Sequence, residues 1–140
     1  MSFKEKSAWV MLISLLVTGI LFSRAVLTNI EMGSIIAPSV PLFIGFTIVL
    51  TLLSIVGHIV IAALSPKDAN GKTDERESRV IEKAGNTSGV IFDVGVVAAL
   101  LLYLLIGNGD ALFYLVFSSL LLASIAEYAI QIYLFRRPMF

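Results

Sequence analysis

Thr87–Ile106 has the sequence TSGVIFDVGVVAALLLYLLI, and this stretch of 20 residues decides the fold class of the 140-residue chain. Its one charged residue is Asp93, and as a helix it is long enough to cross the roughly 30 Å hydrocarbon core of a membrane. Three further stretches, at about residues 8–27, 41–64 and 111–135, have the same character. Because each is apolar all round, the sequence predicts an all-α integral membrane four-helix bundle, with one domain over residues 1–140.

The composition agrees with a chain that lies largely in lipid. Hydrophobic residues make up 58% of the chain and charged residues 14%, whereas an average soluble domain has about 25% charged residues. Ten Lys and Arg balance ten Asp and Glu, so the net charge does not favour a nucleic-acid partner. The absence of cysteine excludes disulfides and thiolate-bound metal centres, and the sequence predicts no cofactor.

The basic residues predict how the chain is oriented. Nine of the ten Lys and Arg lie in the N-terminal tail, in the segment 65–86 or in the C-terminal tail, and the tenth, Arg24, lies in the first span. The loops between spans one and two and between spans three and four have none. Because positive loops stay on the cytoplasmic side, the sequence predicts that both termini and the segment 65–86 are cytoplasmic (N-in/C-in).

A charged helix is expected within the segment 65–86. Asp74 and Glu77 have the spacing of a capping box, and Glu75 with Arg79 forms an i,i+4 pair of favourable order. Together with Arg76, these residues predict a cytoplasmic helix that is available to a cytoplasmic or membrane protein partner. The sequence leaves open whether this helix is hinged or continues into the third span.

Four ionisable residues are predicted to lie inside the membrane: Arg24 is near the outer end of span one, and the other three, His58, Asp93 and Glu127, form the candidate cluster. Their distances from the cytoplasmic ends of spans two, three and four are similar, at roughly 9–12 Å. A charged group near the centre of a membrane helix costs about 2.5–3.5 kcal/mol, so such residues are candidates for a functional site. The cluster is expected to be structural or to bind a proton, a cation or a lipid head group. If it binds a metal, these three residues are the candidate ligands.

Smaller polar residues are expected to support this cluster from the same helices. Thr47, Thr51, Ser54 and His58 are spaced by four, three and four residues and therefore share one face of span two. The simplest assembly turns such polar stripes inward. The predicted supporting residues are Ser14, Thr18, Thr47, Thr51, Ser54, Ser124 and Gln131.

The sequence favours a small non-enzymatic membrane protein and assigns no catalytic residue. The alternatives are an oligomeric transporter or channel subunit and a lipid-modifying membrane enzyme. Membrane lipid, a second copy of the chain and another protein are the expected partners.

The opening MSFKEKSAW (residues 1–9), the helix with His58 and the loop Asp74-Glu75-Arg76-Glu77, followed by Ile81, are similar to an uncharacterised family. This chain resembles those small four-span bacterial inner-membrane proteins, classified as a domain of unknown function, over nearly its whole length. The resemblance implies a bacterial inner (cytoplasmic) membrane location and an accessory role. It implies no activity, substrate or cofactor.

Overall fold

The computed structural model describes residues 1–28, 30 and 36–137 of the chain. These residues form helices and no strand, so the predicted all-α fold is confirmed. The helices are α1 (Phe3–Thr28), α2 (Val40–Leu64), α3 (Pro66–Ala69), α4 (Glu75–Ile106) and α5 (Gly109–Arg136). Among the described residues, α1, α2, α4 and α5 are long and apolar enough to cross a membrane.

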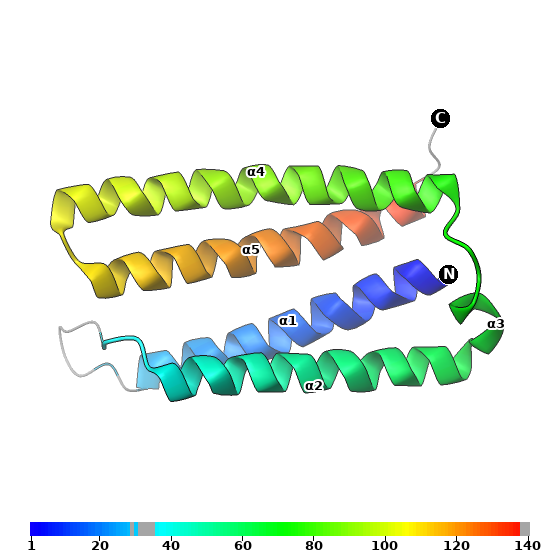
Figure 1. The fold of residues 1–140 in the computed structure, drawn as a ribbon, viewed down its shortest axis with the longest axis horizontal. Helices are drawn as coiled ribbons and strands as arrows, with labels where there is room; N and C mark the ends of the chain where they lie inside the picture. The colour runs from blue at the N-terminus through cyan, green and yellow to red at the C-terminus, as the bar shows by residue number, and fades with distance from the viewer. Residues whose placement is uncertain (29, 31–35, 138–140) are drawn as a thin grey trace.

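The four long helices lie side by side and antiparallel, in the order α2, α1, α5, α4 (Figure 1). α1 packs against α2 and α5, and α5 packs against α4, so α1 and α5 are the inner helices. The start of α1, the end of α5 and the connection through α3 lie at one end of the molecule (Figure 1). We call this end, which holds residues 1–6, 65–79 and 133–137, the charged end.

The sequence around each helix end explains where the helix begins or stops. At the start of α2, the Ser39 hydroxyl accepts a hydrogen bond from the Leu42 N–H, and Pro41 lies in the first turn. Asp74 and Glu77 form the predicted capping box at the start of α4. At its other end, Gly107 adopts φ 72°, a left-handed conformation that glycine tolerates best.

α4 is one continuous helix of 32 residues. It passes through Gly85 and Asn86 without a break, so the charged segment and the third span form a single rod. One face of α4 therefore runs without interruption from the charged end into the apolar part of the helix.

The core at the end opposite the charged end is aromatic. Phe22 of α1 and Phe46 of α2 both contact Phe117 of α5, with ring centroids 4.7 and 5.1 Å apart. Phe43 and Phe113 extend the cluster. Aromatic pairs of this kind contribute about 0.5–1.5 kcal/mol each beyond the area they bury, so the cluster stabilises the contact of three helices.

Close helix contact elsewhere depends on small residues. Gly95 of α4 lies against the side chain of Ser119 of α5, where a Cβ atom would collide with the hydroxyl. Ala84 and Ala99 of α4 are completely or almost completely buried. Small side chains let the backbones approach, which is how apolar helices associate when burial of apolar surface offers little gain.

Candidate functional site

His58 connects α2 to α1. Its Nδ1 atom lies 2.7 Å from the Ser54 carbonyl oxygen, and its Nε2 atom lies 2.8 Å from the hydroxyl of Ser7. Because a carbonyl oxygen only accepts, the contact with Ser54 places a proton on Nδ1. In the neutral tautomer, Nε2 then accepts a hydrogen bond from the Ser7 hydroxyl. Both ring nitrogens therefore have partners within the chain.

Glu127 connects α5 to α4. Its Oε1 atom accepts from the Gln131 amide at 3.3 Å, and its Oε2 atom lies 3.5 Å from the Ser88 hydroxyl, whose single hydrogen it shares with the Gly85 carbonyl oxygen at 2.9 Å. Gly85 leaves room beside this carboxyl group. Gln131 and Ser88 are each 6% exposed, so the contact lies within the α4–α5 interface.

Asp93 lies apart from both residues. It is exposed on α4 and has no hydrogen bond or ion pair with any residue that the structure describes. No three His, Cys, Asp or Glu side chains of the described residues come close enough to hold a metal ion. The structure thus does not bring His58, Asp93 and Glu127 together, because equal depth does not imply that helices turn the same faces toward one another.

Some of the predicted supporting polar residues are buried or half-buried in the bundle, and others are exposed on its surface. Ser14 and Thr18 are buried on α1, and the Thr18 hydroxyl donates to the Ser14 carbonyl oxygen at 2.7 Å. Ser54 is half-buried and donates to the sulfur of Met11 at 3.1 Å. The expectation that Thr47 and Thr51 point inward is wrong: both are exposed and donate to carbonyl oxygens of their own helix. Ser124 is half-buried on α5.

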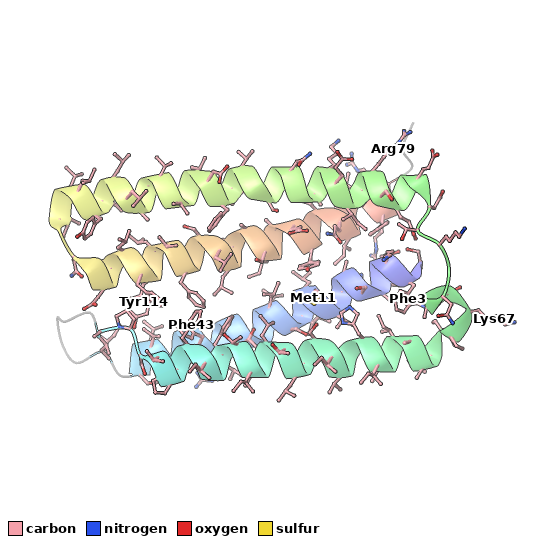
Figure 2. All side chains as sticks on the ribbon, viewed as in Figure 1. Phe3, Met11, Phe43, Lys67, Arg79 and Tyr114 are labelled. Carbon is pink, nitrogen blue, oxygen red and sulfur yellow. The ribbon has the colours of Figure 1, made fainter. Side chains whose placement is uncertain are left out.

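The surface of α4 that faces away from α5 carries exposed residues at regular intervals, most of them polar. Asp93 lies nine residues from the fully buried Ala84, which places it about 180° away around the helix. Figure 2 shows side chains projecting along this free side, with Arg79 at the charged end. The members of the pattern are all exposed and follow one another by four, three, four, three, four and seven residues. We call Glu75, Arg79, Glu82, Asn86, Gly89, Asp93 and Leu100 the outer stripe.

The charged end is held together by contacts between residues far apart in the chain. The carboxylate of Glu5 accepts from the Arg136 guanidinium at 3.1 Å, and that guanidinium lies 5.5 Å from the Trp9 ring centroid. Lys6 donates to the Ser65 hydroxyl at 2.5 Å. Sequence reasoning missed these residues, because nothing near Glu5 indicates a partner 131 residues away.

Arg76, predicted to face a partner, is exposed and also contacts the end of α5. Its guanidinium donates to the carbonyl oxygens of Phe135 and Arg137 at 3.3 and 3.0 Å. Asp74 and Glu77 are engaged in the capping box. Glu75 and Arg79 form the predicted i,i+4 pair at 4.0 Å, with 92% and 74% of their side chains exposed. Of the predicted charged helix, Glu75 and Arg79 therefore leave most of their side-chain surface open to a partner.

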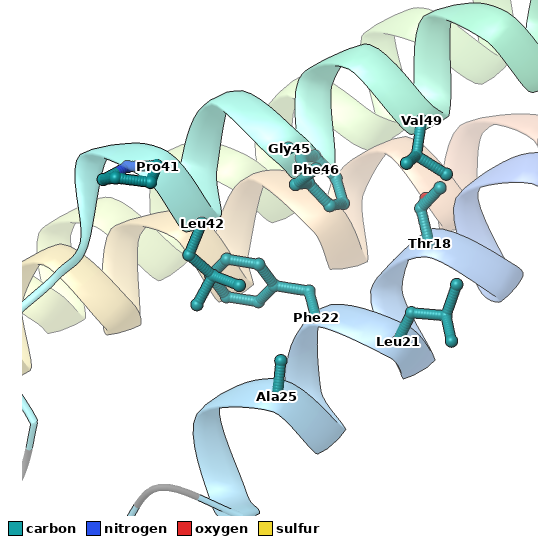
Figure 3. Close-up of a pocket in the computed structure, with 9 residues that line it drawn as sticks. All are labelled: Thr18, Leu21, Phe22, Ala25, Pro41, Leu42, Gly45, Phe46 and Val49. Carbon is teal, nitrogen blue, oxygen red and sulfur yellow. The ribbon is translucent and has the colours of Figure 1, made fainter.

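An apolar pocket of about 280 Å³ opens between α1 and α2 beside the aromatic cluster. Figure 3 shows Phe22 and Leu42 at its centre and Thr18 at one edge. Another cavity, of about 290 Å³, lies at the charged end, and both charged residues such as Lys4 and Lys67 and apolar residues such as Phe3 line it.

Comparison of the chain with protein-family models, with curated proteins and with solved structures finds no match. The structure defines an all-α bundle of four apolar helices with a charged end.

Proposed function

We propose that this chain is an integral membrane protein that spans the bilayer four times, with the charged end in the cytoplasm. The four apolar helices support the membrane location. The orientation is supported by the distribution of basic residues, nine of which lie within residues 4–6, 67–83 and 136–137, at or next to the charged end. The resemblance to small inner-membrane proteins favours the bacterial cytoplasmic membrane.

Within the membrane, the protein acts as a non-enzymatic interaction subunit that binds a membrane helix along the outer stripe of α4. The exposed carboxyl group of Asp93 carries this proposal. Asp93 lies ten residues beyond Lys83, which is the last charged residue before it, so it sits about 15 Å along the helix. Measured from the predicted start of the span at Thr87, Asp93 lies roughly 9 Å into the span. A charged group costs about 2.5–3.5 kcal/mol at the centre of a membrane helix and less toward its end, and a polar protein partner lowers that cost.

The neighbours of Asp93 support a helix rather than lipid as the occupant. Gly89, one turn away, has no side chain and nothing within 4 Å of a Cβ placed there, so another backbone can approach closely. Asn86, a further turn away, is exposed and can both donate and accept hydrogen bonds. Small and amide-bearing residues are the ones that membrane helices use at their interfaces.

His58 and Glu127 have a different role in this proposal. Each contacts a neighbouring helix of its own chain, His58 through Ser7 and Glu127 through Ser88. Their interhelical contacts set the register of α1 against α2 and of α4 against α5.

Photo-crosslinking in native membranes tests the proposal. A p-benzoylphenylalanine replaces Leu100, which lies seven residues beyond Asp93 on the outer stripe, and the control carries it at Val56 of α2, which is 57% exposed. We expect a protein adduct from position 100 that Asp93→Leu diminishes, and no such dependence at position 56. The proposal fails if position 100 gives no protein adduct, or if Asp93→Leu leaves the adduct unchanged.

A further inference from the structure

We propose that the helix on the outer stripe is α4 of a second copy of this chain, and that the two Asp93 carboxyl groups complete one intramembrane site. This inference rests on the proposed function and names its partner. Two copies inserted in the same direction have parallel α4 helices. A two-fold axis along the membrane normal then places each residue of the stripe at the same depth as the same residue of the other copy.

The spacing of the stripe fits a parallel helix pair. From Glu75 to Asp93 the exposed members alternate by four and three residues. The next position of this alternation, Val96, is half-buried, and the exposed Leu100 follows Asp93 by seven. A repeat of seven residues keeps one seam facing a partner helix that crosses at about 20°. The stripe is long enough to continue from the aqueous part of α4 into its apolar part.

The polar members of the stripe are complementary to themselves. An Asn86 amide can donate to and accept from a second Asn86 amide, and Gly89 allows the two backbones to approach. In such a pair the two Asp93 carboxyl groups can share one proton, so that one donates a hydrogen bond to the other and the pair carries one negative charge in place of two. Each copy contributes half of this site, and neither copy satisfies its Asp93 alone.

At the aqueous end of the stripe the two-fold axis brings like charges to the same depth, and the alternation of sign along the stripe offsets their repulsion, with Glu75 and Arg79 already paired within each copy. Glu75, Arg79 and Glu82 alternate in sign at intervals of about one turn on the same exposed face. In a parallel pair, Arg79 of one copy lies within about 6 Å along the axis of Glu75 and Glu82 of the other. The positive side chain of each copy is therefore flanked by negative side chains of its partner.

Cysteine cross-linking of the purified chain tests this inference, because the sequence has no cysteine of its own. Leu100→Cys places a thiol on the seam, and Leu101→Cys places one at the adjacent residue, about 100° around the helix and similarly exposed. In phosphatidylcholine vesicles with a membrane-permeant oxidant, we expect Leu100→Cys to form dimers of twice 15.2 kDa faster than Leu101→Cys.

Substitutions of Asp93 in the Leu100→Cys background test the carboxyl pair. Asp93→Leu removes the hydrogen bond and should weaken dimerisation by about 3- to 30-fold, measured from the protein-to-lipid ratio at half-dimerisation. Asp93→Asn keeps a donor and an acceptor and should retain the dimer. Equal cross-linking at positions 100 and 101, or dimerisation that Asp93→Leu does not change, overturns the inference.

The two proposals fail in different ways. If the purified chain stays monomeric, and native membranes give an Asp93-dependent adduct with a different protein, the inference of a second copy is wrong. The proposed function then still holds. The absence of any adduct at position 100 in native membranes overturns both.

Discussion

Glu5 provides the sharpest test of how the charged end stabilises the fold. It is 6% exposed, and its carboxylate joins the first helix to the last through Arg136. The change Glu5→Gln keeps the size of the side chain and removes its charge. The Arg136 guanidinium then loses its anionic acceptor, while its position over Trp9 can persist.

The expected loss follows from the unequal burial of the two partners. A hydrogen bond to a charged group contributes about 1.5–3 kcal/mol, whereas a fully exposed ion pair contributes about 0–1 kcal/mol. The Glu5 side chain is 9% exposed and that of Arg136 is 59% exposed, so this pair lies between the two cases. We expect Glu5→Gln to lower the free energy of unfolding by about 1–2 kcal/mol.

The assay is reversible unfolding in mixed micelles of a mild detergent and dodecyl sulfate, followed by far-ultraviolet circular dichroism. Glu75→Gln is the matched control, because it removes the same charge from a pair at 4.0 Å whose side chains are 92% and 74% exposed. That control should change the free energy of unfolding by no more than about 0.5 kcal/mol. Equal effects of the two substitutions would refute the argument that burial makes the Glu5 contact important.

Three further substitutions test the packing and the helix ends in the same unfolding assay. Gly95→Ala should destabilise the fold by about 1–3 kcal/mol because the added methyl collides with Ser119, whereas Gly45→Ala, with nothing within 4 Å, should be neutral or stabilising. Stability retained in Gly95→Ala would contradict the close α4–α5 contact. Asp74→Ala should cost about 1 kcal/mol through loss of the α4 cap, and an unchanged midpoint would speak against the capping box. His58→Phe should cost about 1 kcal/mol, and adding Ser7→Ala should cost little more, since both changes remove one hydrogen bond; additive losses would argue against that bond.

Several helices and helix ends could be predicted because they depend on residues that are close together in the sequence. The span over residues 41–64 corresponds to α2, and the capping box of Asp74 and Glu77 is present at the start of α4. The third span was predicted from Thr87, but the helix starts at Glu75, since nothing at Gly85 interrupts its hydrogen bonds. Local hydrogen bonds and the length of an apolar run determine where these helices begin and end. Such features can therefore be predicted from a single sequence.

What the sequence determined by itself is the number of long apolar helices, most of their ends and the gathering of charge in the tails and the central segment. What only the tertiary structure decided is the rotation of each helix about its axis. A helix that is apolar all round has no amphipathic stripe to indicate its packed face, so contacts such as Gly95 with Ser119 set that rotation. The rotation leaves Asp93 exposed while His58 and Glu127 find partners in neighbouring helices. It is also what brings Glu5 and Arg136 together from opposite ends of the chain.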